Sequence, residues 1–96
     1  MPVKRPLKRC QLSGKSIRSL EDFYDQIARK LGFPCYFGRN LDALWDVLTT
    51  DVEGPVQLVW KDSADSKKYL GKDFEKVSAL LGEVQKERPD FHVTFR

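Results

Sequence analysis

The amino-acid sequence predicts an α/β fold, in which a small three-stranded parallel sheet packs with about four helices. Three short segments, residues 7–12, 56–60 and 91–95, have the composition of strands. The stretches between them show helical spacing of apolar residues, and strands separated by helices pair in parallel through right-handed crossovers. The 96 residues suffice for one modest core, so we expect a single domain over residues 7–96, preceded by a disordered basic arm at residues 1–6.

In the first half of the chain, turn signals and capping residues bound the predicted elements. The strand at residues 7–12 leads into a Ser-Gly-Lys turn. A helix then follows Ser19, which forms a weakened capping box with Asp22, and Gly32 can cap its end. Asn40 is a favourable N-cap for a second helix. The stripe that this second helix buries is expected to comprise Leu41, Leu44, Leu48 and Val52.

The second half supplies a strand, two helices and a last strand. Residues 56–60 are an apolar run that suits a strand buried on both sides of a helix-covered sheet, with its tryptophan in the core. A short helix over residues 63–70 would turn Tyr69 and Leu70 inward, and a longer one is expected over residues 73–88. The alternation in the last strand places three residues on one face, with His92 on the other: Phe91, Val93 and Phe95.

Composition argues against a membrane or metal-dependent protein. No apolar run approaches the roughly 18 residues that a bilayer span needs, and the N-terminus has no apolar stretch typical of a signal peptide. We therefore expect a cytoplasmic protein. Cys10 and Cys35 lack the spacing of a zinc site and are expected to be reduced, small apolar side chains. We expect no metal, nucleotide or other cofactor.

Charge is distributed unevenly along the chain. Residues 1–20 carry six basic side chains and no acidic one, whereas residues 21–60 carry three basic and seven acidic side chains. The basic segment from Lys4 to Arg9 is interpreted as a solvated tail, or as an interaction arm for an anionic surface such as nucleic acid.

The acidic pair Asp42 and Asp46 is the most informative feature of the sequence. Residues four apart on a helix share a face, so the two carboxylates are neighbours, beside Trp45. Like charges so placed cost about 0.2 to 0.5 kcal/mol, and nothing in the predicted fold requires them. A local rule broken without structural gain indicates a functional site.

Several readings of this pair compete. A glycosidase needs carboxylates that face each other across a cleft, and these lie side by side on one helix. A hard-cation site would need more oxygen ligands, and the nearby Asp51 and Glu53 match no calcium-binding loop. A surface that mimics nucleic acid would use carboxylates in place of phosphates and the aromatic rings of Tyr36, Phe37 and Trp45 in place of bases. The structural alternative is a solvated helix face whose tryptophan packs at the edge of the core.

A longer pattern favours mimicry. The run PCYFGRNLDALWDVL at residues 34–48, followed by EGPVQLVW at residues 53–60, resembles the barstar family of intracellular ribonuclease inhibitors. The segment GKSIRSLEDF at residues 14–23 and the final helix and strand also fit, so the resemblance covers residues 7 to 95. It implies a small α/β fold with a three-stranded parallel sheet, and a loop and helix that plug the active site of a secreted, basic ribonuclease.

The resemblance also implies roles for individual residues. Asp46 would be the central anchor, reaching the cationic and histidine groups that hold the scissile phosphate, and Asp42 would pair with an arginine of the enzyme. The remaining residues implied at the interface are Tyr36 over the catalytic site, Gly38 and Asn40 shaping the loop, Trp45 as contact or support, and Glu83 as an outer ion-pair partner.

Three departures bear on the partner. Arg39 occupies a loop position that is often acidic in the family, Asp51 stands where an aromatic contact occurs, and the net charge is +3. Attraction to a strongly basic enzyme should therefore be weaker.

The resulting hypothesis is a non-catalytic, immunity-type inhibitor that binds a secreted or toxin-type microbial ribonuclease as a monomer, without binding nucleic acid itself. Two alternatives stay open: a nucleic-acid-binding or regulatory module that uses the basic N-terminal segment, and a barstar-like fold that binds a partner other than a nuclease. Catalysis by the chain itself is not expected, since no nucleophile and base are paired in its motifs.

Overall fold

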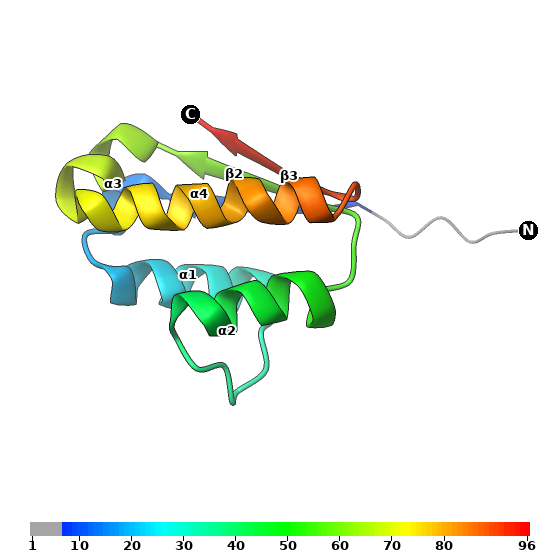
Figure 1. Cartoon of the computed structure of the whole chain (residues 1–96). Coiled ribbons are helices and arrows are strands. Elements are labelled where there is room, and N and C mark those ends of the chain that lie inside the picture. The colour runs from blue at the N-terminus through cyan, green and yellow to red at the C-terminus, as the bar shows by residue number, and fades with distance from the viewer. Residues whose placement is uncertain (1–6) are drawn as a thin grey trace, which may run out of the picture.

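A computed structural model of the chain describes residues 7–96 (Figure 1). The predicted arm at residues 1–6 lies outside the described residues. The elements, in chain order, are β1 (Lys8–Ser13), the 3-10 turn η1 (Gly14–Ser16), α1 (Leu20–Leu31), α2 (Leu41–Asp46), the π-helical turn η2 (Val47–Asp51), β2 (Val56–Lys61), α3 (Ser63–Leu70), α4 (Lys72–Glu87) and β3 (Phe91–Phe95). The predicted three-stranded sheet and four helices are confirmed.

The strands pair in parallel in the order β1-β2-β3, which is also their order in the sequence. Two right-handed crossovers that step in the same direction across a sheet carry their helices to the same face. Burial agrees, because all residues but Lys8 along one face of β1 and β2 are buried, whereas Arg9, Gln11 and Lys61 on the other face are exposed. The prediction that β2 is buried on both sides is confirmed at Val59, but the helices lie on one face only, so the molecule has one helix layer and one sheet (Figure 1).

The open face of the sheet is mainly polar. Its register places Arg9, Gln57 and His92 in one row across the three strands. The next row has Val59 between Gln11 and Thr94, and these neighbours leave Val59 only 9% exposed. Alternation in a strand sends every second side chain to this face, so its polar composition matches its exposure to water.

The core lies between the sheet and the helices and is organised around Trp60. Its indole stacks on Phe23, with ring centroids 5.1 Å apart, and meets the edge of Phe74 at 5.1 Å. The fully buried Ser66 donates its hydroxyl to the Gly14 carbonyl at 2.9 Å and accepts from Trp60 Nε1 at 2.9 Å. This pair of hydrogen bonds ties α3 to η1 and satisfies the indole N–H inside the core.

Capping residues bound α1 as predicted. Ser19 Oγ accepts from the Asp22 backbone N–H at 3.1 Å, and Gly32 adopts the left-handed conformation (φ 67°) that ends the helix. The return contact differs, because the Asp22 carboxylate accepts from the N–H of Arg18 rather than that of Ser19.

One expectation about a buried aromatic residue is wrong. Tyr69 was expected inward, yet it is 53% exposed and lies under the Arg18 guanidinium, 5.6 Å from the ring centroid. Leu70 takes the buried position instead. Phe95 points to the predicted face of β3 but is 40% exposed, because it ends an edge strand.

Glutamine side chains cover backbone groups at both edges of the sheet. Gln26 of α1 accepts from the Ser13 N–H at 2.9 Å and donates to the Ser13 carbonyl at 3.4 Å, at the end of β1. Gln85 of α4 accepts from the Val93 N–H of β3 at 2.9 Å. Both contacts occupy groups that an edge strand would otherwise offer to another chain.

Within residues 7–96, both cysteines are free thiols, Cys10 buried and Cys35 exposed, and burial raises the pKa of Cys10. No helix in this range is long and apolar enough to cross a membrane.

Replacing Ser66 with alanine should lower the free energy of unfolding by about 1 to 3 kcal/mol, because the buried Trp60 N–H loses its acceptor. Urea denaturation measures the change. Ser78→Ala is the matched control, since the Ser78 hydroxyl donates to a backbone carbonyl in an exposed hydrogen bond. Equal losses in the two variants would contradict this role of Ser66.

Candidate functional site

The two carboxylates of α2 face solvent. Asp42 and Asp46 are both exposed, and no side chain within residues 7–96 forms a hydrogen bond or salt bridge with either carboxylate. Leu44 is fully buried on the opposite side of the same helix. The helix therefore buries its apolar face in the core and exposes its acidic face to solvent.

Asn40 joins the preceding loop to the helix. Its Oδ1 accepts from the Ala43 N–H at 2.8 Å, which satisfies one of the open donors of the first turn. Its Nδ2 donates to the Gly38 carbonyl at 3.3 Å. A Cβ at Gly38 would lie 3.2 Å from the Ala43 Cβ, so the small residue lets the loop pack closely on the helix. Both residues thus contribute to the conformation of the loop.

Arg39 turns away from the acidic pair. It adopts a left-handed backbone conformation (φ 55°), and its guanidinium donates to the Glu21 carbonyl at 3.3 Å and pairs with the Asp25 carboxylate, both on α1. The Arg39 guanidinium therefore anchors the loop to α1. It does not neutralise Asp42 or Asp46 by a salt bridge.

The aromatic residues of the loop divide their roles. Phe37 packs its ring edge against Phe33 and Tyr24, with centroids 4.9 Å and 5.8 Å away, so it fastens the loop to the core. Tyr36 is 78% exposed and projects into solvent. Trp45 is half-buried against the core and lies between the two aspartates in the sequence. Exposed aromatic rings are common in surfaces that contact a protein partner.

The expected second helix continues past Asp46, but as a π-helical turn. The Val52 N–H donates to the Val47 carbonyl at 2.9 Å, and Thr49 Oγ1 donates to the Trp45 carbonyl at 2.7 Å. Arg88, which follows α4, donates to two backbone carbonyls at this end of the helix. Neither the π turn nor the role of Arg88 has a signal in the local sequence, so neither was predicted.

Glu83 lies on α4, the helix that packs beside α2. Lys86 Nζ is 3.4 Å from its carboxylate, and both side chains are well exposed, so this pair contributes little and leaves Glu83 available. Between the two helices, a surface hollow of about 490 Å³ has Asp42 and Arg39 on one side and Asp73 and Lys76 on the other. No direct contact joins Glu83 to either aspartate among the described residues.

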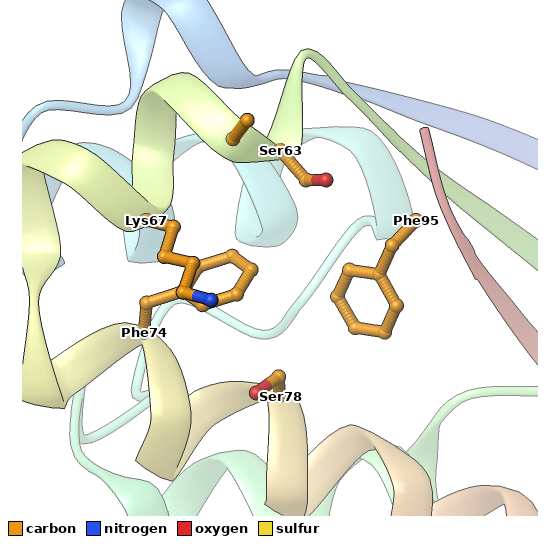
Figure 2. A pocket seen from close by; sticks show the side chains of 6 residues that line it. Ser63, Lys67, Phe74, Ser78 and Phe95 are labelled. Atoms are coloured by element: carbon orange, nitrogen blue, oxygen red, sulfur yellow. The ribbon is translucent and has the colours of Figure 1, made fainter.

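A separate hollow of 380 Å³ lies between α3, α4 and β3 (Figure 2). Phe74 and Phe95 line it with their rings in T-shaped contact, centroids 6.0 Å apart, and Lys67 and Ser78 also line it. None of the predicted interface residues lines this hollow. Within residues 7–96, no group of three His, Cys, Asp or Glu side chains is placed to hold a metal ion.

The sequence of the chain is similar to that of known proteins. A family model described as Barstar (barnase inhibitor) matches residues 7–96. The chain belongs to the barstar family. A barstar relative from Bacillus subtilis strain 168, named "Putative ribonuclease inhibitor YrdF", is 38% identical over 84 residues, which cover 88% of this chain and 92% of the relative.

Replacing Asn40 with alanine should lower the free energy of unfolding by about 1 kcal/mol, because the Ala43 N–H loses its cap. Asn40→Asp keeps the oxygen acceptor and should retain most of the stability. Urea denaturation of both variants tests this, and an equal loss in the aspartate variant would contradict the capping role.

The Arg88–Asp90 pair should make stability depend on pH. Hydrogen bonds from the Arg88 guanidinium, and then its charge, lower the pKa of Asp90. A carboxyl group whose pKa is lowered by folding stabilises the protein above its unfolded pKa, about 3.9, and this contribution is lost as pH falls through the folded pKa. Unfolding free energies of wild type and Asp90→Asn should therefore differ at about pH 6 and converge toward about pH 2. A constant difference would contradict the linkage.

Proposed function

We propose that this barstar-family protein is a stoichiometric, non-catalytic inhibitor of a microbial ribonuclease, and that it occupies the enzyme's active site with α2 and the loop before it. The observation that carries the proposal is the exposed, unpaired state of Asp42 and Asp46 on a capped helix. Isolated like charges cost stability, so their unneutralised presence is best explained by a cationic partner.

The mechanism is electrostatic and steric. A ribonuclease holds the scissile phosphate with cationic side chains, and carboxylates at the same positions accept the same hydrogen bonds. Asp46 is the central anchor and Asp42 an arginine partner, while Tyr36 covers the catalytic groups and Glu83 pairs at the rim. Trp45 supports the helix from its half-buried position. The inhibitor carries no scissile phosphodiester and leaves the active site filled.

A rigid presentation favours tight binding. Asn40 caps the helix, Phe37 fastens the loop to the core and Arg39 ties it to α1. Because these contacts exist before the partner arrives, little conformational entropy remains to be lost on association. The loop and helix are therefore a pre-organised ligand for the enzyme.

The cellular setting follows from this chemistry. A ribonuclease that is secreted, or delivered as a toxin, endangers the RNA of any cell that contains it. The proposed role is that of a cytoplasmic immunity protein, acting as a monomer on such an enzyme. The name of the B. subtilis relative supports a ribonuclease as the class of partner.

The alternatives predict different determinants of binding. Nucleic-acid binding through the basic N-terminal segment would depend on residues 1–9 and weaken steeply with salt. A barstar-like protein with a partner other than a nuclease would bind through the same face without inhibiting any ribonuclease. The exposed acidic face favours the inhibitor, since carboxylates repel nucleic acid.

Replacing Asp42 and Asp46 together with alanine should abolish inhibition of a ribonuclease that the wild-type protein inhibits, because the enzyme's cationic groups lose their partners. The melting temperature should stay the same or rise slightly, since an i,i+4 repulsion is removed. Titration of a panel of microbial ribonucleases measures the first effect and thermal unfolding the second.

Removing residues 1–6 provides the control for the basic arm and should leave inhibition intact. Inhibition that survives the double substitution, or a wild-type protein that inhibits no member of the panel, would contradict the proposal.

A further inference from the structure

Arg88 connects the end of α4 to the far end of the acidic helix. Its side chain is only 14% exposed. Nη1 donates to the Leu48 carbonyl at 2.6 Å and to the Val52 carbonyl at 2.7 Å. Nε and Nη2 donate to the two carboxylate oxygens of Asp90 at 3.0 Å and 2.9 Å, in a forked arrangement. One guanidinium thus holds two backbone carbonyls of the helix end and is itself held by an acid.

The π-helical turn explains why those carbonyls need a partner. In a continuous α-helix the Val52 N–H would donate to the Leu48 carbonyl. Here it donates to Val47 instead, so the Leu48 carbonyl is released by Val52 inside a partly buried segment. Val52 ends the turn, and its own carbonyl has no helical donor following it. The donors of Arg88 replace those that the π turn removes.

Gly54 shows how closely this arrangement is packed. A Cβ built at Gly54 would overlap the Asp90 carboxylate and come within 2.6 Å of Arg88 Nη2. Residue 54, two positions after Val52, therefore has to be small so that the Arg88–Asp90 pair can pack against its backbone. The Arg88–Asp90 pair therefore has a defined geometry and is more buried on its arginine side than an ordinary surface ion pair.

We infer that Arg88 is a positioning residue of the binding site: by fixing the π turn that begins directly after Asp46, it holds that carboxylate in the orientation that the partner requires. The inference rests on the proposed function. Asp46 immediately precedes the turn, and the Thr49 hydroxyl also reaches back from the turn to the Trp45 carbonyl. Loosening the turn therefore loosens the last residues of α2.

The first experiment needs no partner. Native-state hydrogen exchange compares wild type with Arg88→Ala, and with Arg88→Lys should the alanine variant fail to fold. In the Arg88 variant, the amides of residues 50–52 should exchange at least about tenfold faster than in the wild type, because hydrogen bonds from a charged donor are lost. This increase should exceed any increase at the amides of β2. Arg29→Ala, which removes an exposed arginine of α1, should change neither region.

The second experiment measures binding to the ribonuclease that the wild type inhibits. Dissociation should accelerate about tenfold in the Arg88 variant, with association changed by less than about threefold, because the flexible turn must be ordered again in the complex. Gln26→Ala is the control for general destabilisation, since it removes hydrogen bonds to Ser13 on β1. It should leave the dissociation rate unchanged.

The outcomes separate the two claims. Unchanged exchange at residues 50–52 overturns the role of Arg88 in the turn, whatever the protein binds. Faster exchange with an unchanged dissociation rate, or an equal rise in Gln26→Ala, overturns its role in positioning Asp46. A wild-type protein that inhibits no ribonuclease overturns the proposed function, and with it the positioning role, even where exchange shows that Arg88 holds the turn.

Discussion

The sequential order of three parallel strands is the constraint on which the arrangement of this molecule depends. Because both crossovers are right-handed and step the same way across the sheet, every helix falls on one face. The helices must then share a single layer, in which α2 packs against α4 as well as the core. One side of α2 remains uncovered as a consequence, and this is the side that carries Asp42 and Asp46.

The loop and both ends of α2 are fixed by contacts that come from different parts of the chain. Asn40 caps the start locally, Arg39 reaches α1, and Arg88 reaches back from the residue after α4. Two of these three contacts join segments far apart in sequence. The acidic helix is thus held by the completed fold, and six α-helical residues followed by a π turn could not be stable alone.

The elements that local patterns determine could be predicted from the sequence. Ser19, Gly32 and Asn40 act through hydrogen bonds or backbone conformations within a few residues, and the structure confirms all three. Placement of the helices on one face could not be derived, because it depends on strand order, which no local pattern encodes. The position of Tyr69 could not be predicted for a related reason. The side that α3 buries is set by its contact with η1, where Ser66 bonds to Gly14, and these two residues are 52 positions apart in the sequence.

For the candidate site, the exposed residues could be proposed from the sequence, but the residues that hold them in place could not. Asp42, Asp46 and Tyr36 follow from charge placement and from the family motif, and they are exposed as a binding role requires. Arg88 has no such signal, since a single arginine before Pro89 is unremarkable until the released carbonyl of Leu48 is known. Its role arises from the π turn, and that turn depends on tertiary contacts.

The two-layer arrangement also places part of the basic charge of this chain, whose net charge is +3, away from α2. The open face of the sheet carries Arg9 and Lys61, and the strand positions that point to it include no aspartate or glutamate. This positive charge lies on the opposite side of the sheet from the helix layer. Packed layers are roughly 10 Å apart, which exceeds the Debye length of about 8 Å at physiological ionic strength. The helix layer also carries basic side chains, and Arg39 and Lys76 line the same hollow as Asp42. The local field around α2 therefore depends on the charges nearest to it, and it bears more directly on the partner than the net charge does.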